Sequence, residues 1–219
     1  MRFGRRSRQG LGATAAEFGH PAVAANTGDG ARTELAADEI AFVICVEANQ
    51  LLPQARLLCE SIRTFGGRYR DAPIVAVSPR PHLALSPRQA AELTALGATH
   101  VNLPLNTTGS AYGTINRIVA GAWAEATLPQ PYLVVLDTDM MMLGEPRFVR
   151  ADVGVRPVDS KGSATAGPHD QLDAYWDRLC TIAGITLDDL PTLRTTISDE
   201  PIRASYNGGF SVVRRDLGV

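Results

Sequence analysis

The sequence predicts an α/β fold with a mainly parallel central sheet and helices on both faces. Short apolar runs alternate with helical patterns from residue 40 onward, which is typical of repeated strand–helix–strand units. The runs are apolar at nearly every position, as expected of strands that are buried on both faces of a sheet. Parallel strands joined in this way have right-handed crossover connections, so the order of the elements also predicts their handedness.

The first unit starts with the apolar run from Ile40 to Val46, which predicts a strand. A helix is expected next, because apolar residues recur at helical spacing and the glycines Gly66 and Gly67 can end it. The expected buried face of this helix consists of Ala55, Leu58, Cys59, Ile62 and Phe65.

The second unit contains a strand from Pro73 to Val77 and a helix with a clear start signal. Ser86 is the expected N-cap, Pro87 occupies the first turn, and Gln89 completes a capping box. The expected buried stripe of this helix consists of Ala90, Leu93 and Leu96.

A short strand near Thr99 to Leu103 precedes the third helix, which leads into a strand from Tyr132 to Leu136. One side of this helix is expected to be buried, and it carries Ile115, Ile118, Val119, Ala122 and Trp123.

Beyond the last of these strands the rhythm breaks at three prolines, at positions 146, 157 and 168, which indicate loops. A further helix is expected from Gln171 to Ala183, with its aligned apolar residues in the core. The aligned apolar residues of this helix are Leu172, Tyr175, Trp176, Leu179 and Ile182.

A final strand from Gly209 to Val213 follows the segment Tyr206 to Gly209, where paired glycines would permit positive φ in a loop.

The composition predicts one main domain, since 219 residues with 45% hydrophobic and 20% charged residues can bury a sizeable core. A net charge of −2 gives no electrostatic case for a nucleic-acid partner. Residues 1–38 lack useful periodicity and are expected to be a disordered leader, so the domain covers residues 39–219. No apolar run approaches the roughly 20 residues of a membrane span. The three scattered cysteines are typical of reduced core thiols, and we expect a cytoplasmic protein.

The acidic motif Asp137-Thr138-Asp139 directly follows the apolar run that ends at Leu136. Residues two apart on an extended chain project from the same side, so both carboxylates could converge on one cation. Oxygen ligands without nearby Cys or His favour Mg²⁺ or Mn²⁺, which commonly serves a substrate phosphate. Ligands of open α/β sheets bind at the carboxyl ends of strands, and this position favours a metal site over a simple turn.

With these pieces, the chain resembles a GT-A-fold glycosyltransferase with a Rossmann-like sheet over about Ile40 to Arg215. It is most similar to the glycogenin-like and galactosyltransferase-like family 8 enzymes. The matching segments, in order, are Ala41-Phe-Val-Ile-Cys-Val46, Asn116-Arg117, Leu136-Asp-Thr-Asp-Met140 and Asn207-Gly-Gly-Phe210. The resemblance implies transfer of a sugar from a nucleotide-diphosphate donor, usually a UDP-sugar, to an acceptor hydroxyl that the sequence does not identify. Mn²⁺ or Mg²⁺ would bridge the carboxylates and the diphosphate.

The resemblance also implies roles for particular residues. Asp139 would bind the metal directly, and Asp137 would share the metal and approach the donor ribose, with Thr138 between them beside the donor. Arg117 would contact the donor phosphate or sugar, while Asn207 and Gly208 would lie near the transferred sugar. The segment implied to receive the nucleotide base consists of Val46, Glu47, Ala48 and Asn49.

Further candidates are weaker. His169 and Asp170 are possible sugar contacts, although Asp170 could instead cap the helix that follows it. An inverting reaction would need a carboxylate base, for which Asp199 and Glu200 are candidates, whereas likeness to family 8 implies retention of the anomeric configuration.

Other interpretations stay open at this point. The similar enzymes commonly supply a further metal ligand, often a histidine, beyond the last matched strand, whereas this sequence ends at Val219. A C-terminally truncated domain, or a non-catalytic nucleotide-sugar-binding protein, is therefore the main alternative. A haloacid-dehalogenase-like phosphatase would have Thr or Val where Met141 stands. A sugar-1-phosphate nucleotidyltransferase would need a glycine-rich basic loop, and the segment from Glu47 to Pro53 has no glycine.

Overall fold

The computed structural model describes residues 33–110 and 112–217. These residues form two compact units. The larger unit contains described residues 33–158 and 206–217, and the smaller unit contains residues 159–205. The greater part of the leader predicted for residues 1–38 lies outside the described residues.

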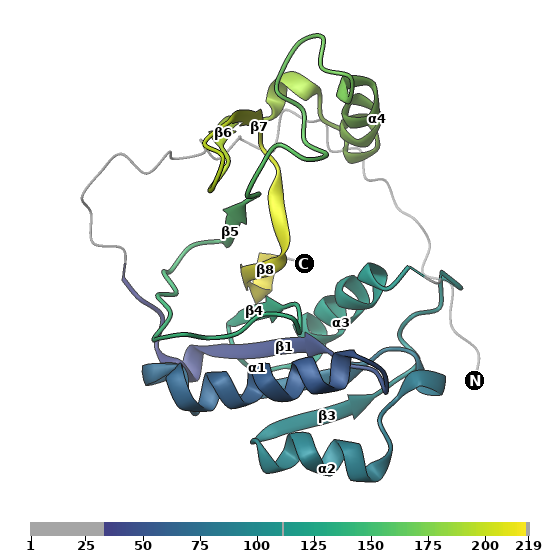
Figure 1. Ribbon diagram of the computed structural model, residues 1–219, viewed down its shortest axis with the longest axis vertical. Coiled ribbons are helices and arrows are strands. Elements are labelled where there is room, and N and C mark those ends of the chain that lie inside the picture. Colours follow the sequence, from purple (N-terminus) through teal and green to yellow (C-terminus); the bar gives the residue numbers. More distant parts are fainter. Residues whose placement is uncertain (1–32, 111, 218–219) are drawn as a thin grey trace. The chain divides into compact units, whose positions relative to one another are not determined.

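Within the described residues, the larger unit contains a six-stranded sheet with the strand order β3-β2-β1-β4-β8-β5 (Figure 1). The four strands from β3 to β4 are parallel, while β8 pairs antiparallel with both β4 and β5. The predicted mainly parallel sheet is thus confirmed. The strands are β1 (Ile40–Cys45), β2 (Ile74–Ser78), β3 (Ala98–Asn102), β4 (Tyr132–Leu136), β5 (Val153–Pro157) and β8 (Tyr206–Arg214).

Helices cover both faces of this sheet, and the alternation of side chains along each strand produces two cores. Phe42 and Ile44 of β1 pack in a cluster with residues of α1 and α2. Ala41 and Val43 point the other way and pack with α3. The helices are α1 (Leu51–Phe65), α2 (Pro87–Ala95) and α3 (Thr114–Thr127), with 3₁₀ turns η1 (Ala37–Glu39), η2 (Gly67–Tyr69), η3 (Pro81–Leu83) and η5 (Arg215–Leu217).

The ordered domain begins earlier than the predicted boundary at residue 39. Leu35 is 0% exposed and belongs to the core cluster of α1 and α2. Its backbone N–H donates to the Phe148 carbonyl over 2.8 Å, and its carbonyl accepts the Tyr69 hydroxyl over 2.7 Å. The end of the expected leader is therefore part of the fold, because an apolar residue there completes the core.

The first helix ends, and the second helix starts, as predicted. The N–H of Gly66 caps α1 on the Ile62 carbonyl, and Ser86 and Gln89 form the expected capping box of α2. Phe65 departs from the prediction, since it is 49% exposed at the last turn of α1.

The buried face of α3 differs from the predicted one. Asn116, Ala120 and Ala124 are buried, whereas Ile118 is 62% exposed and Ala122 is exposed as well. Small alanine side chains allow α3 to lie close to the sheet, so the buried face is rotated from the predicted one, although Trp123 of the predicted face still packs against the core. The buried Asn116 gives this helix a polar group at the functional end of the sheet.

The final strand is longer than predicted. β8 begins at Tyr206, so the expected glycine loop from Tyr206 to Gly209 is part of the sheet. Neither Gly208 nor Gly209 has positive φ. Their small size, rather than conformational freedom, is what this segment requires.

The smaller unit contains α4 (Asp173–Ala183), the 3₁₀ turn η4 (Leu187–Asp189) and an antiparallel pair of strands, β6 (Thr192–Arg194) and β7 (Pro201–Arg203). The predicted helix is confirmed, but its apolar face is not core within the described residues: Tyr175 and Ile182 are exposed, and Cys180 is buried instead. A left-handed Gly184 ends the helix.

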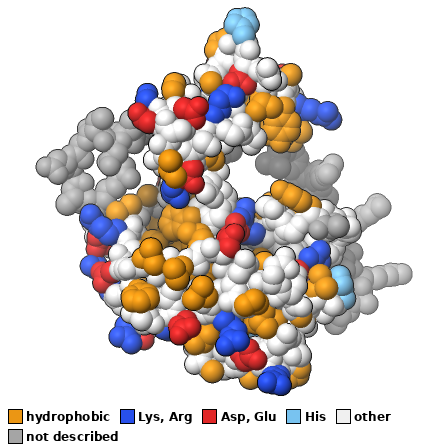
Figure 2. Space-filling model, in the orientation of Figure 1, with side chains coloured by type: hydrophobic (Ala, Val, Ile, Leu, Met, Phe, Trp, Pro, Cys, Tyr) orange, Lys and Arg blue, Asp and Glu red, His pale blue; other side chains and the backbone are white. Residues whose placement is uncertain are grey.

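The surface shows the charge balance expected from composition. Acidic and basic side chains are interspersed over the face drawn in Figure 2.

Over residues 33–110 and 112–217, we find no helix with both the length and the apolar character of a membrane span. All three cysteines are free thiols.

The different burial of Ile62 in α1 and Ile118 in α3 gives a prediction about stability. Ile62→Ala should lower the free energy of unfolding by about 2–5 kcal/mol, because Ile62 is fully buried. Ile118→Ala should change it by less than about 0.5 kcal/mol, because that side chain is largely in solvent. Urea unfolding of both variants measures the difference, and equal losses would contradict the observed orientation of α3.

Candidate functional site

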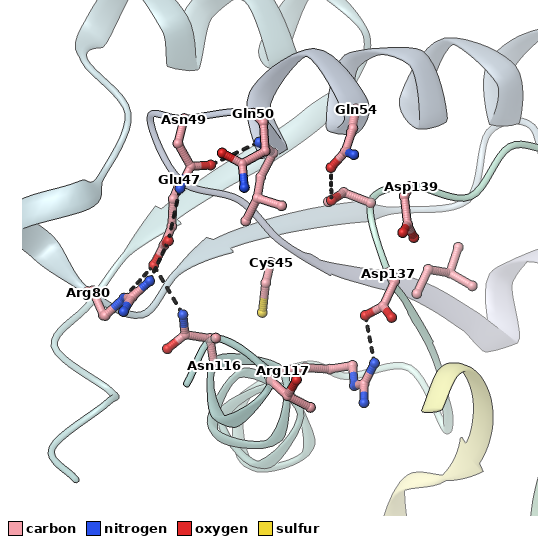
Figure 3. Close-up of a pocket in the computed structure, with 15 residues that line it drawn as sticks. Cys45, Glu47, Asn49, Gln50, Gln54, Arg80, Asn116, Arg117, Asp137 and Asp139 are labelled. Carbon is pink, nitrogen blue, oxygen red and sulfur yellow. Dashed lines mark hydrogen bonds and ion pairs between the residues drawn. The ribbon is translucent and has the colours of Figure 1, made fainter. Parts of the chain in front are cut away.

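A cavity of about 290 Å³ opens at the carboxyl ends of β1 and β4, next to the start of α1 and α3 (Figure 3). Polar side chains from α1, from α3 and from the segments that follow β1, β2 and β4 border it. Its lining consists of Cys45, Glu47, Asn49, Gln50, Leu51, Gln54, Arg80, Gly113, Thr114, Asn116, Arg117, Leu136, Asp137, Thr138 and Asp139. The sheet edge predicted to bind a ligand is therefore hollow and polar.

Asp137 forms an ion pair at one end of this cavity. Its Oδ1 accepts a hydrogen bond from Nη1 of Arg117 on α3 over 2.6 Å (Figure 3). The backbone N–H of Asp137 donates to the Gly209 carbonyl over 2.8 Å, so the ladder between β4 and β8 continues one residue beyond β4. This bond holds the carboxylate beside the glycines of β8.

The chain turns directly after Asp137, with the Met140 N–H facing the Asp137 carbonyl over 3.4 Å. The extended geometry assumed for the acidic motif is therefore wrong, although both carboxylates border the same cavity. Thr138 is buried and donates to Oε1 of Gln54 over 3.3 Å. Asp139 is exposed and forms no hydrogen bond or ion pair within the part of the chain that the structure describes.

The other end of the cavity contains a buried charge pair. Glu47 is only 2% exposed, and Arg80 donates to it through Nε and Nη2, both over 2.7 Å. Nδ2 of Asn116 also donates to Glu47, over 3.1 Å. This hydrogen bonding raises the pKa of the Arg80 guanidinium, so the group stays charged.

A second cavity, of about 430 Å³, shares Asp137 and Asp139 with the first. Its other lining residues are Met140, Arg156, Asn207, Gly209 and Phe210. The Asn207 amide oxygen accepts the Gly209 N–H over 2.9 Å, which fixes the side chain against its own strand. The two acids thus stand where two cavities meet.

The glycines of β8 make this close arrangement possible. A Cβ atom at Gly208 would lie 2.6 Å from Nη2 of Arg117. A Cβ atom at Gly209 would lie 2.9 Å from Oδ2 of Asp137. Larger residues at either position would displace the ion pair.

Other predicted site residues lie elsewhere or have structural partners. Val46 is buried in the core, and its N–H and carbonyl bond to Val77 and Ser78. Ala48 is exposed and its N–H donates to the Leu83 carbonyl. The Asn49 side chain accepts the Leu51 N–H and so caps the start of α1.

His169 and Asp170 belong to the smaller unit. His169 has a positive φ of 73°. Asp170 accepts the Leu172 N–H over 3.0 Å and pairs with Lys161 over 2.9 Å, and these interactions lower its pKa to about 2. Asp170 thus binds within its own loop, and it is not the N-cap of α4, which is Leu172.

Asp199 and Glu200 also lie in the smaller unit, where both carboxylates accept hydrogen bonds. Arg194 pairs with Asp199, and the pKa of Asp199 falls below its usual value mainly through this hydrogen bond. Glu200 accepts the Ser198 hydroxyl and the Lys161 N–H, which lower its pKa as well.

Sequence reasoning missed several lining residues, above all Arg80 and Gln54. Arg80 follows β2 by two residues, so its place at the carboxyl end of a parallel strand was a usable signal. Gln54 lies in the first turn of α1, where neither spacing nor residue type marks it as a ligand.

The donor chemistry of the acidic end fits a hard divalent cation. Within the described residues, the Asp139 carboxylate and Oδ2 of Asp137 have no hydrogen-bond partner in the protein. Mg²⁺ is typically bound by one or two carboxylates together with substrate phosphates. In residues 33–110 and 112–217, no group of three or more His, Cys, Asp or Glu could hold a metal.

Comparisons with known proteins point to glycosyltransferases. The model of the Rhodobacterales glycosyltransferase domain matches residues 42–217. A search of curated proteins gives no match.

Solved glycosyltransferase structures are similar at low identity. Core-mannan synthase A from Aspergillus fumigatus, in an Mn/GDP form, is 10% identical, with 87% of this chain and 62% of that chain covered and a TM-score of 0.47. Mouse xyloside xylosyltransferase 1, in its apo form, is 13% identical, with coverage of 81% and 66% and a TM-score of 0.44. The apo WbbM bifunctional glycosyltransferase is 14% identical, with coverage of 85% and 33% and a TM-score of 0.49. The chain spans less than two thirds of the length of each.

Cys45 in the cavity wall gives a prediction about pH. Burial raises the pKa of this thiol to about 12, so roughly one molecule in 10⁴ carries the thiolate at pH 8. Alkylation of Cys45 by iodoacetamide should be slow at pH 8 and should rise about tenfold per pH unit up to pH 10. Peptide mapping by mass spectrometry measures the rate, and a plateau below pH 10 would contradict the raised pKa.

Proposed function

This chain belongs to the Rhodobacterales glycosyltransferase domain family, and we propose that it transfers a sugar from a nucleotide-diphosphate donor to an acceptor hydroxyl in a metal-dependent reaction. The observation that carries this proposal is the pair Asp137 and Asp139 at the carboxyl end of β4, where two cavities meet beside Arg117. One cavity would take the nucleotide, and the other, bordered by Asn207, would take the sugar.

The acidic motif would hold Mn²⁺ or Mg²⁺. Asp139 is the stronger candidate ligand because its carboxylate is free within the described residues, and Asp137 would contribute the oxygen that Arg117 does not hold. A bound cation would offset the negative charge that develops on the departing nucleoside diphosphate.

Arg117 would act on the same charge. Its guanidinium is held at the cavity wall by Asp137, and its side chain is 21% exposed, so it keeps donors available to a phosphate. A diphosphate would compete with Asp137 for Arg117. Release of Asp137 by this competition would free a second carboxylate for the metal, so nucleotide and metal would bind more tightly together than separately.

The reaction exchanges one bond at the anomeric carbon of the sugar. The bond to the diphosphate oxygen breaks with its electron pair staying on the diphosphate, the acceptor oxygen bonds to the carbon, and the acceptor proton leaves. Positioning by Asn207 and Gly208 would hold the sugar in place for this exchange. Asp199 and Glu200 stay untested as bases, and the likeness to family 8 favours retention.

The base of the donor is not fixed by the acidic motif. The resemblance to family 8 favours UDP, whereas the similar core-mannan synthase A structure is an Mn/GDP form. Both nucleotides therefore belong in the first experiment. A non-catalytic nucleotide-sugar-binding protein is the alternative, and it would bind donor without hydrolysing or transferring the sugar.

Removal of one carboxylate tests the metal-dependent site. Asp139→Asn should reduce binding of UDP and GDP in the presence of Mn²⁺ to below detection, because it removes the free carboxylate of the motif. The melting temperature should change little, since the side chain is exposed and forms no hydrogen bond with the described residues. Isothermal titration calorimetry with and without Mn²⁺ measures the effect.

The matched control is Asp71→Asn, an exposed acid in the loop before β2, which should bind as the wild type does. Manganese-independent binding, or binding that survives Asp139→Asn, would refute the proposed metal role. Donor binding without turnover in the presence of varied acceptors would favour the non-catalytic alternative.

A second substitution tests the space that glycine leaves for Arg117. Gly208→Ala should weaken manganese-dependent nucleotide binding by about tenfold, because the new Cβ would meet Arg117 at 2.6 Å and push it away. The free energy of unfolding should change by less than about 1 kcal/mol, since the far end of a flexible side chain can move. Gly154→Ala is the control, because its nearest contact in the same sheet is an ordinary 3.5 Å. Wild-type affinity in Gly208→Ala would argue against a role for Arg117.

A further inference from the structure

The carboxylate of Glu47 has its hydrogen-bonding capacity filled by the protein. Two bonds come from Arg80, one from Asn116 over 3.1 Å, and one from Nδ2 of Asn49 over 3.4 Å (Figure 3). A carboxylate offers about four acceptor positions. Glu47 therefore has no position left for an N–H group of a ligand, although the resemblance places it where the base binds.

One edge of the Arg80 guanidinium does not bond to Glu47 and can donate hydrogen bonds to a ligand. Nε and Nη2 face Glu47, while Nη1 has no partner within residues 33–110 and 112–217. A guanidinium has five N–H donors, so the edge formed by Nη1 and the second hydrogen of Nη2 can still donate two parallel bonds. The side chain is 18% exposed and is fixed by Glu47, so this edge is preorganised.

Arg80 also borders two cavities. It lines the site cavity and a neighbouring one of about 340 Å³, which includes His82, Asn106 and Ser110 in its lining. Asn106 donates to the Asn116 amide oxygen over 2.9 Å, so the amide of Asn116 is occupied at both ends. The free N–H groups of Arg80 are therefore the charged donors that a ligand can reach at this end of the cavity, away from the acidic motif.

These observations select among nucleobases. Guanine presents two adjacent acceptors, O6 and N7, which match the two parallel donors of an arginine. Uracil has no pair of adjacent acceptors, because an N–H stands between its two carbonyls, so it cannot take both parallel bonds from Arg80.

We propose that Arg80, held in place by Glu47, binds the base of the nucleotide donor and selects guanine over uracil. This inference rests on the proposed function and refines its donor. Arg80 is the residue that contacts the ligand, and Glu47 is a positioning residue. The expected preference for GDP over UDP is about 5- to 150-fold in Kd, the range that one bidentate arginine–guanine contact gives.

A series of diphosphates with Mn²⁺ tests the contact atom by atom on the whole chain. Inosine diphosphate keeps O6 and N7 and should bind like GDP. The 7-deaza analogue of GDP lacks the N7 acceptor and should bind at least about fivefold more weakly. UDP should bind more weakly than GDP. Calorimetric Kd values at one salt concentration make the four ligands comparable.

Arg80→Lys provides the protein side of the test. Lysine keeps the positive charge beside Glu47 but cannot donate two parallel bonds, so the ratio of UDP to GDP Kd values should fall to within about twofold of one. The affinity for UDP should stay within about threefold of the wild type, which a general loss of structure would not allow. Arg88→Lys, at an exposed position in α2, is the matched control and should keep the full preference.

The outcomes separate this inference from the proposed function. Manganese-dependent binding in which UDP equals or exceeds GDP would overturn the base assignment and leave the glycosyltransferase proposal standing. The assignment would be supported by two results together. In the wild type, the 7-deaza analogue would lose the preference that GDP has over UDP, and in Arg80→Lys, GDP itself would show no preference over UDP. Should Arg80→Lys fail to fold, the ligand series on the wild-type chain still decides. Absence of binding by every diphosphate would overturn both proposals.

Discussion

The pairing of β4 with β1 on one side and with β8 on the other is the constraint on which the site depends. Leu136 lies opposite Ile44 in the parallel ladder and opposite Phe210 in the antiparallel one. The chain therefore leaves β4 at Asp137 with the end of β1 on one flank and the glycines of β8 on the other. Cores on both faces hold these strands in register, since a slip by one residue would exchange the two faces.

The polar groups at this edge are arranged as pairs because the sheet beneath them is apolar. Glu47 follows β1, in which residues 40–44 are buried, and an unpaired carboxylate there would cost several kcal/mol. Arg80 and Asn116 remove that cost by hydrogen bonding from two different elements. This requirement explains why α3 buries an asparagine at this end of the sheet.

The sequence predicted the strands well, and the reason is physical. Strands buried on both faces are apolar throughout, so Tyr132–Leu136 could be read directly. The buried side of α3 could not, because close packing against a sheet favours small residues over large apolar ones. The acidic motif was found from its position after a strand. The place of Arg80 after β2 was a usable signal, but its pairing with a carboxylate 33 residues away leaves no local pattern and could not be predicted.

The two acids of the motif look equivalent in the sequence and are unequal in the structure. Asp137 is balanced by Arg117 and tied to β8 through its backbone, whereas Asp139 is exposed after the turn. Balancing one acid lets both lie at one edge without the repulsion that two free carboxylates would suffer. It also leaves a single free negative charge facing two cavities. Loss of the Asp137 side chain would disturb Arg117 and β8 together, while loss of the Asp139 side chain would remove negative charge alone. Substitution of Asp139 therefore separates the electrostatic role of the site from its structural role.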